Sequence, residues 1–218
     1  MCVCFVSNMF TGIVQSCVPV VSFTHEGGHA VMTLLFPEDR VRGLQRGASV
    51  AIDGACLTVT EIDNARVSFD LMGETLAKTT LGQLKEGNQV NIERSASLGD
   101  EIGGHLLSGH ITGTAEIVAI DHPENNHVLT FHVPPEWMKY IFPKGFIALD
   151  GASLTIVDVD KAAGAFTIWL IPETLRITTF GFKKTGDRVN VEIDSRTQTI
   201  VDTVQVLMHA VDKKGGLL

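Results

Sequence analysis

Two side chains at matching places in this sequence, together with one histidine, carry the groups needed for covalent or proton-transfer chemistry. Cys56 has a thiol, which becomes a strong nucleophile when its surroundings favour the thiolate. Ser153 has a hydroxyl, a far weaker nucleophile without an adjacent base. His110 has an imidazole, which titrates near neutral pH and suits a general base. Structural alternatives stay open, because buried cysteines often act as small hydrophobic residues and histidines as simple hydrogen-bonding ones.

The places of Cys56 and Ser153 match because the chain contains two copies of one pattern. Asp53-Gly54-Ala55-Cys56-Leu57-Thr58 recurs 97 residues later as Asp150-Gly151-Ala152-Ser153-Leu154-Thr155. Other landmarks recur in the same order at similar separations: Phe10-Thr11-Gly12 as Ile111-Thr112-Gly113, His29 as His127, Pro37-Glu38 as Pro135-Glu136, Glu74-Thr75-Leu76 as Glu173-Thr174-Leu175, and Gly87-Asn88-Gln89-Val90-Asn91 as Gly186-Asp187-Arg188-Val189-Asn190. An ordered series of this kind predicts two tandem domains of the same fold.

Each copy has the pattern of short β-strands. The candidate strands are rich in β-branched residues and are separated by Gly, Asp and Asn turns. We expect them at residues 49–52, 57–62, 66–71 and 89–93 of the first copy, and at 147–149, 154–159, 165–171 and 188–193 of the second. Short helical turns are expected at 135–140 and after Glu74 and Glu173. Many antiparallel strands in about 100 residues favour a small closed barrel, which leaves no exposed sheet edge.

The pattern changes after the second copy, over residues 197–211. Apolar residues recur there at intervals of three and four, with two further ones beside them: Ile200, Val204, Leu207, Val211, Val201 and Met208. This spacing predicts a helix with an apolar stripe along one side. Two roles are open for the stripe, packing against its own barrel or association with other subunits.

Composition and charge narrow the classes of function. Of the 218 residues, 44% are hydrophobic and 19% are charged, which is typical of a globular chain. The formal net charge is −8 and no basic run is present, so nucleic acid is not expected as a partner. No apolar run approaches the roughly 18 residues of a membrane span, and the first residues lack the basic n-region of a secretory signal. We therefore expect a cytoplasmic protein that does not enter membranes.

The four cysteines show no metal-binding spacing. Cys2 and Cys4 form a CxC pair, and two ligands cannot close a tetrahedral zinc site. Cys17 and Cys56 complete the set, and four cysteines in a chain of this length are not typical of a disulfide framework. No glycine-rich βαβ unit for a nicotinamide cofactor is present. We expect neither a metal nor a cofactor.

Several motifs in the correct order closely resemble the riboflavin synthase family. They are Met9-Phe10-Thr11-Gly12-Ile13-Val14-Gln15, Gly54-Ala55-Cys56-Leu57-Thr58-Val59-Thr60, Asp100-Glu101-Ile102-Gly103-Gly104-His105-Leu106 with Ser108-Gly109-His110, and Ile171-Pro172-Glu173-Thr174-Leu175. The resemblance runs from Met9 to about Val211. It implies an all-β fold of two tandem six-stranded Greek-key β-barrels with a C-terminal α-helix. It also implies a homotrimer that assembles through those helices.

The resemblance further implies an activity. Members of the family join two molecules of 6,7-dimethyl-8-ribityllumazine by transfer of a four-carbon unit, giving riboflavin and 5-amino-6-(D-ribitylamino)uracil without metal or external cofactor. Each barrel binds one lumazine, and a working site forms between the N-terminal barrel of one subunit and the C-terminal barrel of its neighbour. The alternative is a non-enzymatic lumazine- or flavin-binding protein of the fluorescent antenna type. Such relatives tend to lose the second-copy motifs and the Ser-Gly-His histidine, and this chain keeps both.

The domain boundaries follow from the repeat and the resemblance. We expect the N-terminal barrel at residues 9–103, the C-terminal barrel at 104–196, and the trimerisation helix with its tail at 197–218. Chains of the family begin at the methionine that matches Met9. We therefore expect translation to start there, with residues 1–8 as an extension from a misassigned start.

Two sets of residues match the substrate-binding segments of the family, one in each copy. The first-copy set is Phe10, Thr11, Gly12, Ile13, Val14, Ser49, Cys56, Leu57, Thr58, Asp70, Leu71, Met72, Gly73, Glu74 and Thr75. The second-copy set is Gly109, His110, Ile111, Lys144, Ser153, Leu154, Thr155, Ile171, Pro172, Glu173, Thr174, Leu175 and Arg176. A flat heteroaromatic ring needs an apolar slot with polar partners at its edge, and the ribityl chain needs hydroxyl and carboxylate partners.

The catalytic candidates differ between the copies. His110 is the expected base for the proton of the lumazine C7 methyl group, whereas His105 is expected to be structural. Cys56 is expected to act as nucleophile or proton donor in the acceptor barrel, with Ser153 in the donor barrel. Asp194 is a lesser catalytic candidate, as are Thr11 and Phe10.

Overall fold

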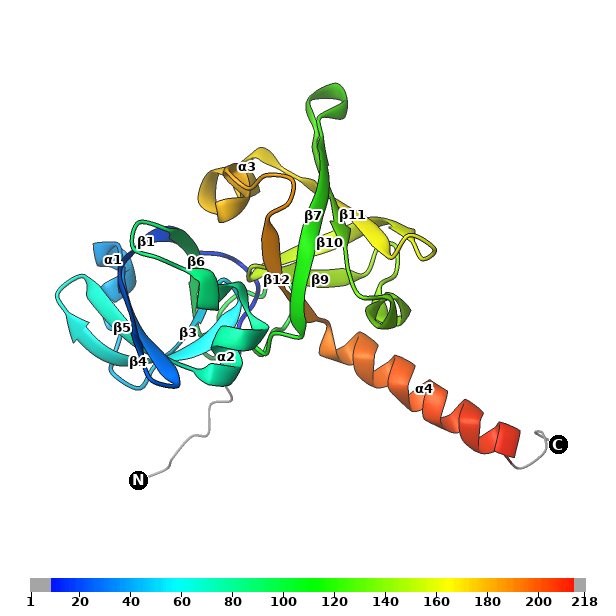
Figure 1. The fold of residues 1–218 in the computed structure, drawn as a ribbon, viewed down its shortest axis with the longest axis horizontal. Helices are drawn as coiled ribbons and strands as arrows, with labels where there is room; N and C mark the ends of the chain where they lie inside the picture. The colour runs from blue at the N-terminus through cyan, green and yellow to red at the C-terminus, as the bar shows by residue number, and fades with distance from the viewer. Residues whose placement is uncertain (1–8, 214–218) are drawn as a thin grey trace.

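The computed structural model describes residues 9–213, so the expected extension over residues 1–8 and the end of the tail lie outside the described residues. The chain folds into two closed antiparallel barrels of six strands, followed by one long helix (Figure 1). The first barrel contains β1 (Ser16–Glu26), β2 (His29–Leu35), β3 (Ser49–Ile52), β4 (Ala55–Asp63), β5 (Arg66–Met72) and β6 (Gln89–Arg94).

The second barrel repeats the first strand by strand. It contains β7 (Gly113–Asp121), β8 (His127–His132), β9 (Phe146–Leu149), β10 (Ala152–Asp160), β11 (Ala165–Leu170) and β12 (Arg188–Ile193). Around the first barrel the strands run β1-β2-β5-β4-β3-β6, and the second barrel has the same order with its own six strands. The predicted all-β fold of two tandem six-stranded barrels with a C-terminal helix is confirmed.

Helices are few and short apart from the last. The α-helices are α1 (Glu38–Val41), α2 (Gly73–Lys78), α3 (Pro172–Ile177) and α4 (Ser195–Lys213). The 3₁₀ helices are η1 (Thr80–Gln83), η2 (Pro123–Asn125), η3 (Pro135–Tyr140) and η4 (Thr179–Gly181). The expected helical turns at 135–140 and after Glu74 and Glu173 are thus confirmed. Within residues 9–213, none of the helices has the length and apolarity needed to cross a membrane.

Alternation of side chains along the strands builds one core in each barrel. In β4, Leu57 and Val59 point into the first core, and Thr58 between them is exposed. In the second barrel the rings of Phe131 and Phe166 stack with their centroids 5.4 Å apart. Closure of the sheet buries these faces completely and pairs every strand on both sides.

The segment that leads into each barrel crosses to the other barrel. Phe10 and Leu107 form an isolated antiparallel bridge with two backbone hydrogen bonds of 2.9 Å. Beyond this bridge Val14 joins the core of the second barrel, and Ile111 packs against the core of the first. Residues Gly12 to Val14, expected to bind substrate in the first copy, therefore precede β1 and lie against the second copy.

This crossing corrects one landmark of the repeat. The backbone amides of Thr11 and Gly12 donate to Glu93, and those of Ser108 and Gly109 donate in the same way to Glu192. The two glycines also share a left-handed conformation, with φ of 74° and 76°. Thr11-Gly12 thus corresponds to Ser108-Gly109, and the sequence alignment with Thr112-Gly113 is wrong.

The strand register corrects a second landmark. Ala30 pairs with Leu71 at the end of β5, and His127 pairs with Leu170 at the end of β11. His127 therefore occupies the place of Ala30 and not that of His29. The two histidines lie almost as far apart in the sequence as the other matching residues, and aligning them with each other shifted the alignment by one residue.

A buried polar junction joins the two barrels. The side-chain amide of Asn91 donates to the backbone oxygen of Asp150 (2.9 Å), and that of Asn190 donates to the backbone oxygen of Asp53 (2.8 Å). The carboxyl groups of Asp53 and Asp150 accept the backbone N–H groups of Asn91 and Asn190, each at 2.7 Å. Each barrel thus satisfies buried polar atoms of the other, which fixes their relative position.

The junction contains one cation for two buried carboxyl groups. Lys183 Nζ lies 2.8 Å from Asp150 Oδ2, and the first copy has Leu84 at the matching position after its 3₁₀ helix. Burial, followed by the neighbouring Asp150, raises the pKa of Asp53 well above its ordinary value. Burial alone would lower the pKa of Lys183, but Asp150 and Asp53 outweigh it and raise that pKa. Lys183 therefore stays charged and neutralises the junction.

Replacing Lys183 with methionine should lower the free energy of unfolding by about 3–5 kcal/mol, because the buried carboxyl group of Asp150 would lose its ion-pair partner. Lys184→Met is the matched control, since that side chain is exposed. Urea unfolding followed by circular dichroism measures both. A loss for Lys183→Met no larger than that for Lys184→Met would show that the ion pair does not hold the barrels together.

Candidate active site

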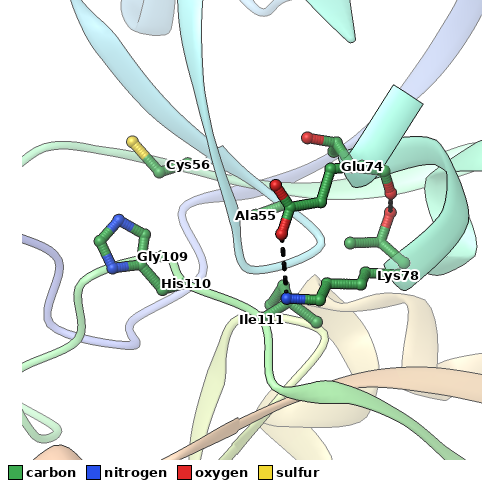
Figure 2. Close-up of a pocket in the computed structure, with 9 residues that line it drawn as sticks. Ala55, Cys56, Glu74, Lys78, Gly109, His110 and Ile111 are labelled. Carbon is green, nitrogen blue, oxygen red and sulfur yellow. Dashed lines mark hydrogen bonds and ion pairs between the residues drawn. The ribbon is translucent and has the colours of Figure 1, made fainter. Parts of the chain in front are cut away.

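A pocket of about 380 Å³ opens on the first barrel beside α2 (Figure 2). Its walls come from β4, α2 and the crossing segment of the second copy: Ala55, Cys56, Glu74, Thr75, Lys78, Thr79, Gly109, His110 and Ile111. Figure 2 shows the thiol of Cys56 and the imidazole of His110 at one side of this pocket. The ion pair of Glu74 with Lys78, 3.0 Å long, lies at the other side.

Close backbone contact brings the crossing segment to this pocket. The backbone N–H of Cys56 donates to the backbone oxygen of Gly109 at 2.9 Å. A Cβ atom on Gly109 would lie 2.5 Å from the Cβ of Cys56, so only glycine fits here. Gly109, His110 and Ile111 therefore serve the first barrel. Their predicted role in the pocket of their own copy is wrong.

A buried carboxylate holds the crossing segment from the other side. Glu192 Oε1 accepts the backbone N–H and the hydroxyl of Ser108, both at 2.8 Å, and Oε2 accepts the N–H of Gly109 at 3.0 Å. The next residue along the chain is His110, whose side chain is exposed at the pocket. Glu192, a strand residue of the second barrel, thus binds the two residues that precede His110.

The second barrel has the equivalent arrangement. The backbone N–H of Ser153 donates to the oxygen of Gly12 at 2.8 Å, and a Cβ on Gly12 would lie 2.5 Å from the Cβ of Ser153. Glu93 accepts the N–H and hydroxyl of Thr11 and the N–H of Gly12 at 2.6–3.0 Å. The residue that follows is Ile13, so this segment brings no ionisable group.

His105 supplies the imidazole that Ile13 does not. Its Nδ1 lies 2.6 Å from Ser153 Oγ, and its ring stacks on Phe146 with centroids 5.1 Å apart. Burial lowers the pKa of His105, so the ring is neutral near pH 7, and its Nε2 is buried without a hydrogen-bond partner among the described residues. The prediction that His105 is merely structural did not anticipate this contact with a catalytic candidate.

Asp194 shares a smaller pocket with His105. This pocket, of about 230 Å³, is lined by Ile102, Gly104, His105, Leu106, Phe146, Asp194 and Arg196. The Asp194 carboxylate caps α4, since it accepts the N–H and hydroxyl of Thr197 at 3.0 and 2.7 Å. Burial alone would raise the pKa of Asp194, but the hydrogen bonds from Thr197 outweigh it and lower that pKa. Asp194 is therefore an anion near His105.

The thiol of Cys56 is not acidified. Burial raises the pKa of this thiol, a side-chain hydrogen bond with Ser49 opposes the rise, and the carboxylate of Glu192 adds to it. A cysteine nucleophile needs the opposite shift. Cys56 is thus present as the neutral thiol near pH 7, which suits a proton donor better than a nucleophile.

The other predicted binding residues divide by position. Leu57, Leu71 and Leu154 are buried in the barrel cores, and Phe10 is buried between the barrels. Glu173 forms an ion pair with Arg176 on α3, as Glu74 does with Lys78 on α2. Thr174 and Leu175 on α3 are half-buried, and Leu175 packs against the second core. The remaining ones have side chains or backbone at the surface: Thr58, Asp70, Met72, Gly73, Lys144, Thr155, Ile171 and Pro172.

Glu93 and Glu192 are functional candidates that the sequence reasoning missed. Both lie in strands, buried to more than nine-tenths, within the repeated triplets Asn91-Ile92-Glu93 and Asn190-Val191-Glu192. Acidic residues are rarely buried unless they have partners. A glutamate at the same place in two apolar strands was therefore a signal that could have indicated a special role.

Comparison with known proteins identifies the family. A family model for the lumazine binding domain matches residues 11–95 and again residues 108–194, in agreement with the pairing of Thr11 and Ser108. Riboflavin synthase of Escherichia coli (strain K12) is 52% identical over 203 residues, which cover 93% of this chain and 94% of that protein. Riboflavin synthase of Chlamydia pneumoniae is 46% identical over 205 residues, covering 94% and 100%.

Solved structures agree with the fold. LumP in complex with 6,7-dimethyl-8-(1'-D-ribityl) lumazine superposes with a TM-score of 0.75 at 26% sequence identity, over 84% of this chain and 98% of that one. LumP in complex with riboflavin gives the same TM-score at 28% identity. With two lumazine-binding domains and close curated relatives that match almost end to end, the chain belongs to the riboflavin synthase family.

Proposed function

We propose that this protein is a riboflavin synthase that converts two molecules of 6,7-dimethyl-8-ribityllumazine into riboflavin and 5-amino-6-(D-ribitylamino)uracil. The observation that carries the proposal is that two like barrels present unlike groups, Cys56 with His110 in one and Ser153 with His105 in the other. A dismutation treats identical molecules differently, one as donor and one as acceptor of four carbons. All atoms of the two substrates appear in the two products, so no further reactant is needed.

Duplication of the barrel supports this chemistry. Holding two reactants in a fixed geometry makes a bimolecular step effectively unimolecular and can lower the barrier by about 7–11 kcal/mol. Each barrel supplies one binding place, and the shared site is formed by the first barrel of one subunit and the second barrel of its neighbour. The crossing segments tie Cys56 to Gly109 and Ser153 to Gly12. The reactive groups at each of the two binding places are therefore always the same.

The roles of the reactive groups follow from their surroundings. His110 accepts the proton of the C7 methyl group, whose anion is delocalised into the lumazine ring. Cys56 is a neutral thiol before the reaction, because its pKa is raised, and it donates this proton to the acceptor lumazine. In the other barrel the hydrogen bond between neutral His105 and the Ser153 hydroxyl positions this hydroxyl beside the donor lumazine, with the anion of Asp194 nearby.

The terminal helix supports a homotrimer. Ile200, Val204 and Leu207 on α4 are 65%, 48% and 60% exposed, so these three side chains of the stripe are not covered by their own barrel. Figure 1 shows α4 extending away from both barrels. Asp202, near the middle of α4, accepts hydrogen bonds from Lys139 Nζ at 2.9 Å and from the hydroxyl of Tyr140 at 2.7 Å. A helix fixed at this angle with an uncovered apolar stripe fits association with copies of itself.

The cytoplasmic location stays a prediction from the sequence.

An antenna-type carrier is the alternative function, because LumP shares the fold. Incubating the purified protein with the lumazine separates the two. We expect riboflavin absorbance to appear over many turnovers, with half a molecule of riboflavin formed for each lumazine consumed. Stoichiometric binding of lumazine with no riboflavin would assign the chain to the carriers instead.

Exchange at the two matching positions should affect the reaction unequally. Cys56→Ser should lower kcat far more than it weakens lumazine binding, as when an interaction of the transition state is lost. Ser153→Ala removes one hydrogen bond to His105 and should cost about 0.5–1.5 kcal/mol. Single-turnover riboflavin formation and lumazine affinity are measured for both variants and for the double variant Cys56→Ser with Ser153→Cys. The added Ser153→Cys change should not restore the activity that Cys56→Ser loses. Equal small effects would make Cys56 a packing residue.

Charges on the apolar stripe should dissociate the trimer. Val204→Asp with Leu207→Asp places two carboxylates on the stripe, and light scattering should then detect monomers with greatly reduced turnover. Gln198→Asp with His209→Asp adds the same charges on the opposite side of α4 and is the matched control. A fully active monomer would contradict the shared site.

A further inference from the structure

We propose that Glu192 is a positioning residue for the pocket of the first barrel, although it lies in β12 of the second. Its carboxylate sets the place of His110 by anchoring the two residues that precede this histidine. The inference rests on the proposed function, because it concerns the base of that reaction. It makes the activity of one barrel depend on a strand of the other.

The contacts form a short chain from carboxylate to imidazole. Three hydrogen bonds reach Glu192, two from Ser108 and one from Gly109. The N–H of His110 in turn donates to the hydroxyl of Ser108 at 3.3 Å. Among the described residues the ring of His110 makes no hydrogen bond of its own. Its location in the pocket is therefore determined by the backbone before it.

The anchor lies between the two reactive groups. Gly109, which Glu192 holds, is pressed against Cys56 through the 2.9 Å backbone hydrogen bond and the contact that excludes a Cβ. Glu192 is only 6% exposed, and it is close to both reactive groups. Burial raises the pKa of Cys56 and the charge of Glu192 adds to that rise, whereas the charge of His110 opposes the rise that burial causes in the pKa of Glu192 itself. Loss of its hydrogen bonds would shift the His110 backbone relative to Cys56.

The first copy contains an internal control for a purely structural role. Glu93 anchors Thr11 and Gly12 by the same three hydrogen bonds, in an equally buried strand. The residue that follows Gly12 is Ile13, which has no ionisable group. If the carboxylates only stabilised the fold, their loss would have equal consequences. If Glu192 positions a base, its loss should affect the chemical step more.

The test compares Glu192→Gln, Glu93→Gln and Glu61→Gln in the full-length protein. A glutamine at 192 can accept both bonds from Ser108, but its NH₂ group then faces the N–H of Gly109, and two donors repel. Glu61 is an exposed strand residue and controls for loss of a negative charge. Ser108→Ala removes the two hydrogen bonds of the hydroxyl, one to Glu192 and one from the N–H of His110, and keeps both backbone bonds to Glu192. This variant serves if Glu192→Gln does not fold by circular dichroism.

We expect Glu192→Gln to lower kcat about 10-fold or more with little change in the dissociation constant of the lumazine, as a displaced catalytic group does. Ser108→Ala should show the same pattern more weakly, Glu93→Gln should lose much less in kcat, and Glu61→Gln should match the unmodified protein. Equal losses in the two buried variants, or no loss in Glu192→Gln, would overturn the proposal.

A second readout does not depend on turnover. The ring C–H signals of His110 in ¹H–¹³C NMR should shift in Glu192→Gln and stay in place in Glu93→Gln. If the unmodified protein binds lumazine without forming riboflavin, the proposed function fails while this comparison still decides the positioning role. Unchanged His110 signals in Glu192→Gln would overturn that role.

Discussion

The structure depends on one backbone contact made twice, in which a glycine of each crossing segment accepts a hydrogen bond from the reactive residue of the opposite barrel. Gly109 meets Cys56, and Gly12 meets Ser153. A Cβ atom would collide at either place, so only glycine allows the segment to approach the opposite barrel this closely. The buried carboxylates behind the glycines hold this arrangement, and the polar junction fixes the relative position of the two barrels.

A nearly symmetric frame therefore supports an asymmetric site. The same geometry that delivers His110 to one pocket delivers Ile13 toward the other, and His105 makes up the difference by contacting Ser153. One linker, running from His105 to His110, thus provides an imidazole to each barrel. Such a difference between copies is what a reaction between two identical molecules requires, since one must give carbon atoms and the other must receive them.

Eight of the twelve strands could be placed from the sequence pattern, whereas β1, β2, β7 and β8 and the crossing of the leading segments could not. Strand positions such as Ser49–Ile52 and Arg188–Ile193 followed directly from β-branched residues between turn residues. Local patterns carry no information about which barrel a leading segment will contact, so Gly109 and His110 were assigned to their own copy. The correct match of Thr11 with Ser108 depends on shared hydrogen bonds to glutamates, and two different residue types conceal it in the sequence.

The proposed function requires two unequal lumazine places on each chain, defined by the crossing segments. A crystal structure with an unreactive lumazine analogue tests it most directly. We predict one analogue beside Cys56 and His110 and a second beside Ser153 and His105, with the two rings facing each other across neighbouring subunits. An analogue bound in one barrel alone, or in both barrels away from these residues, would contradict the claim.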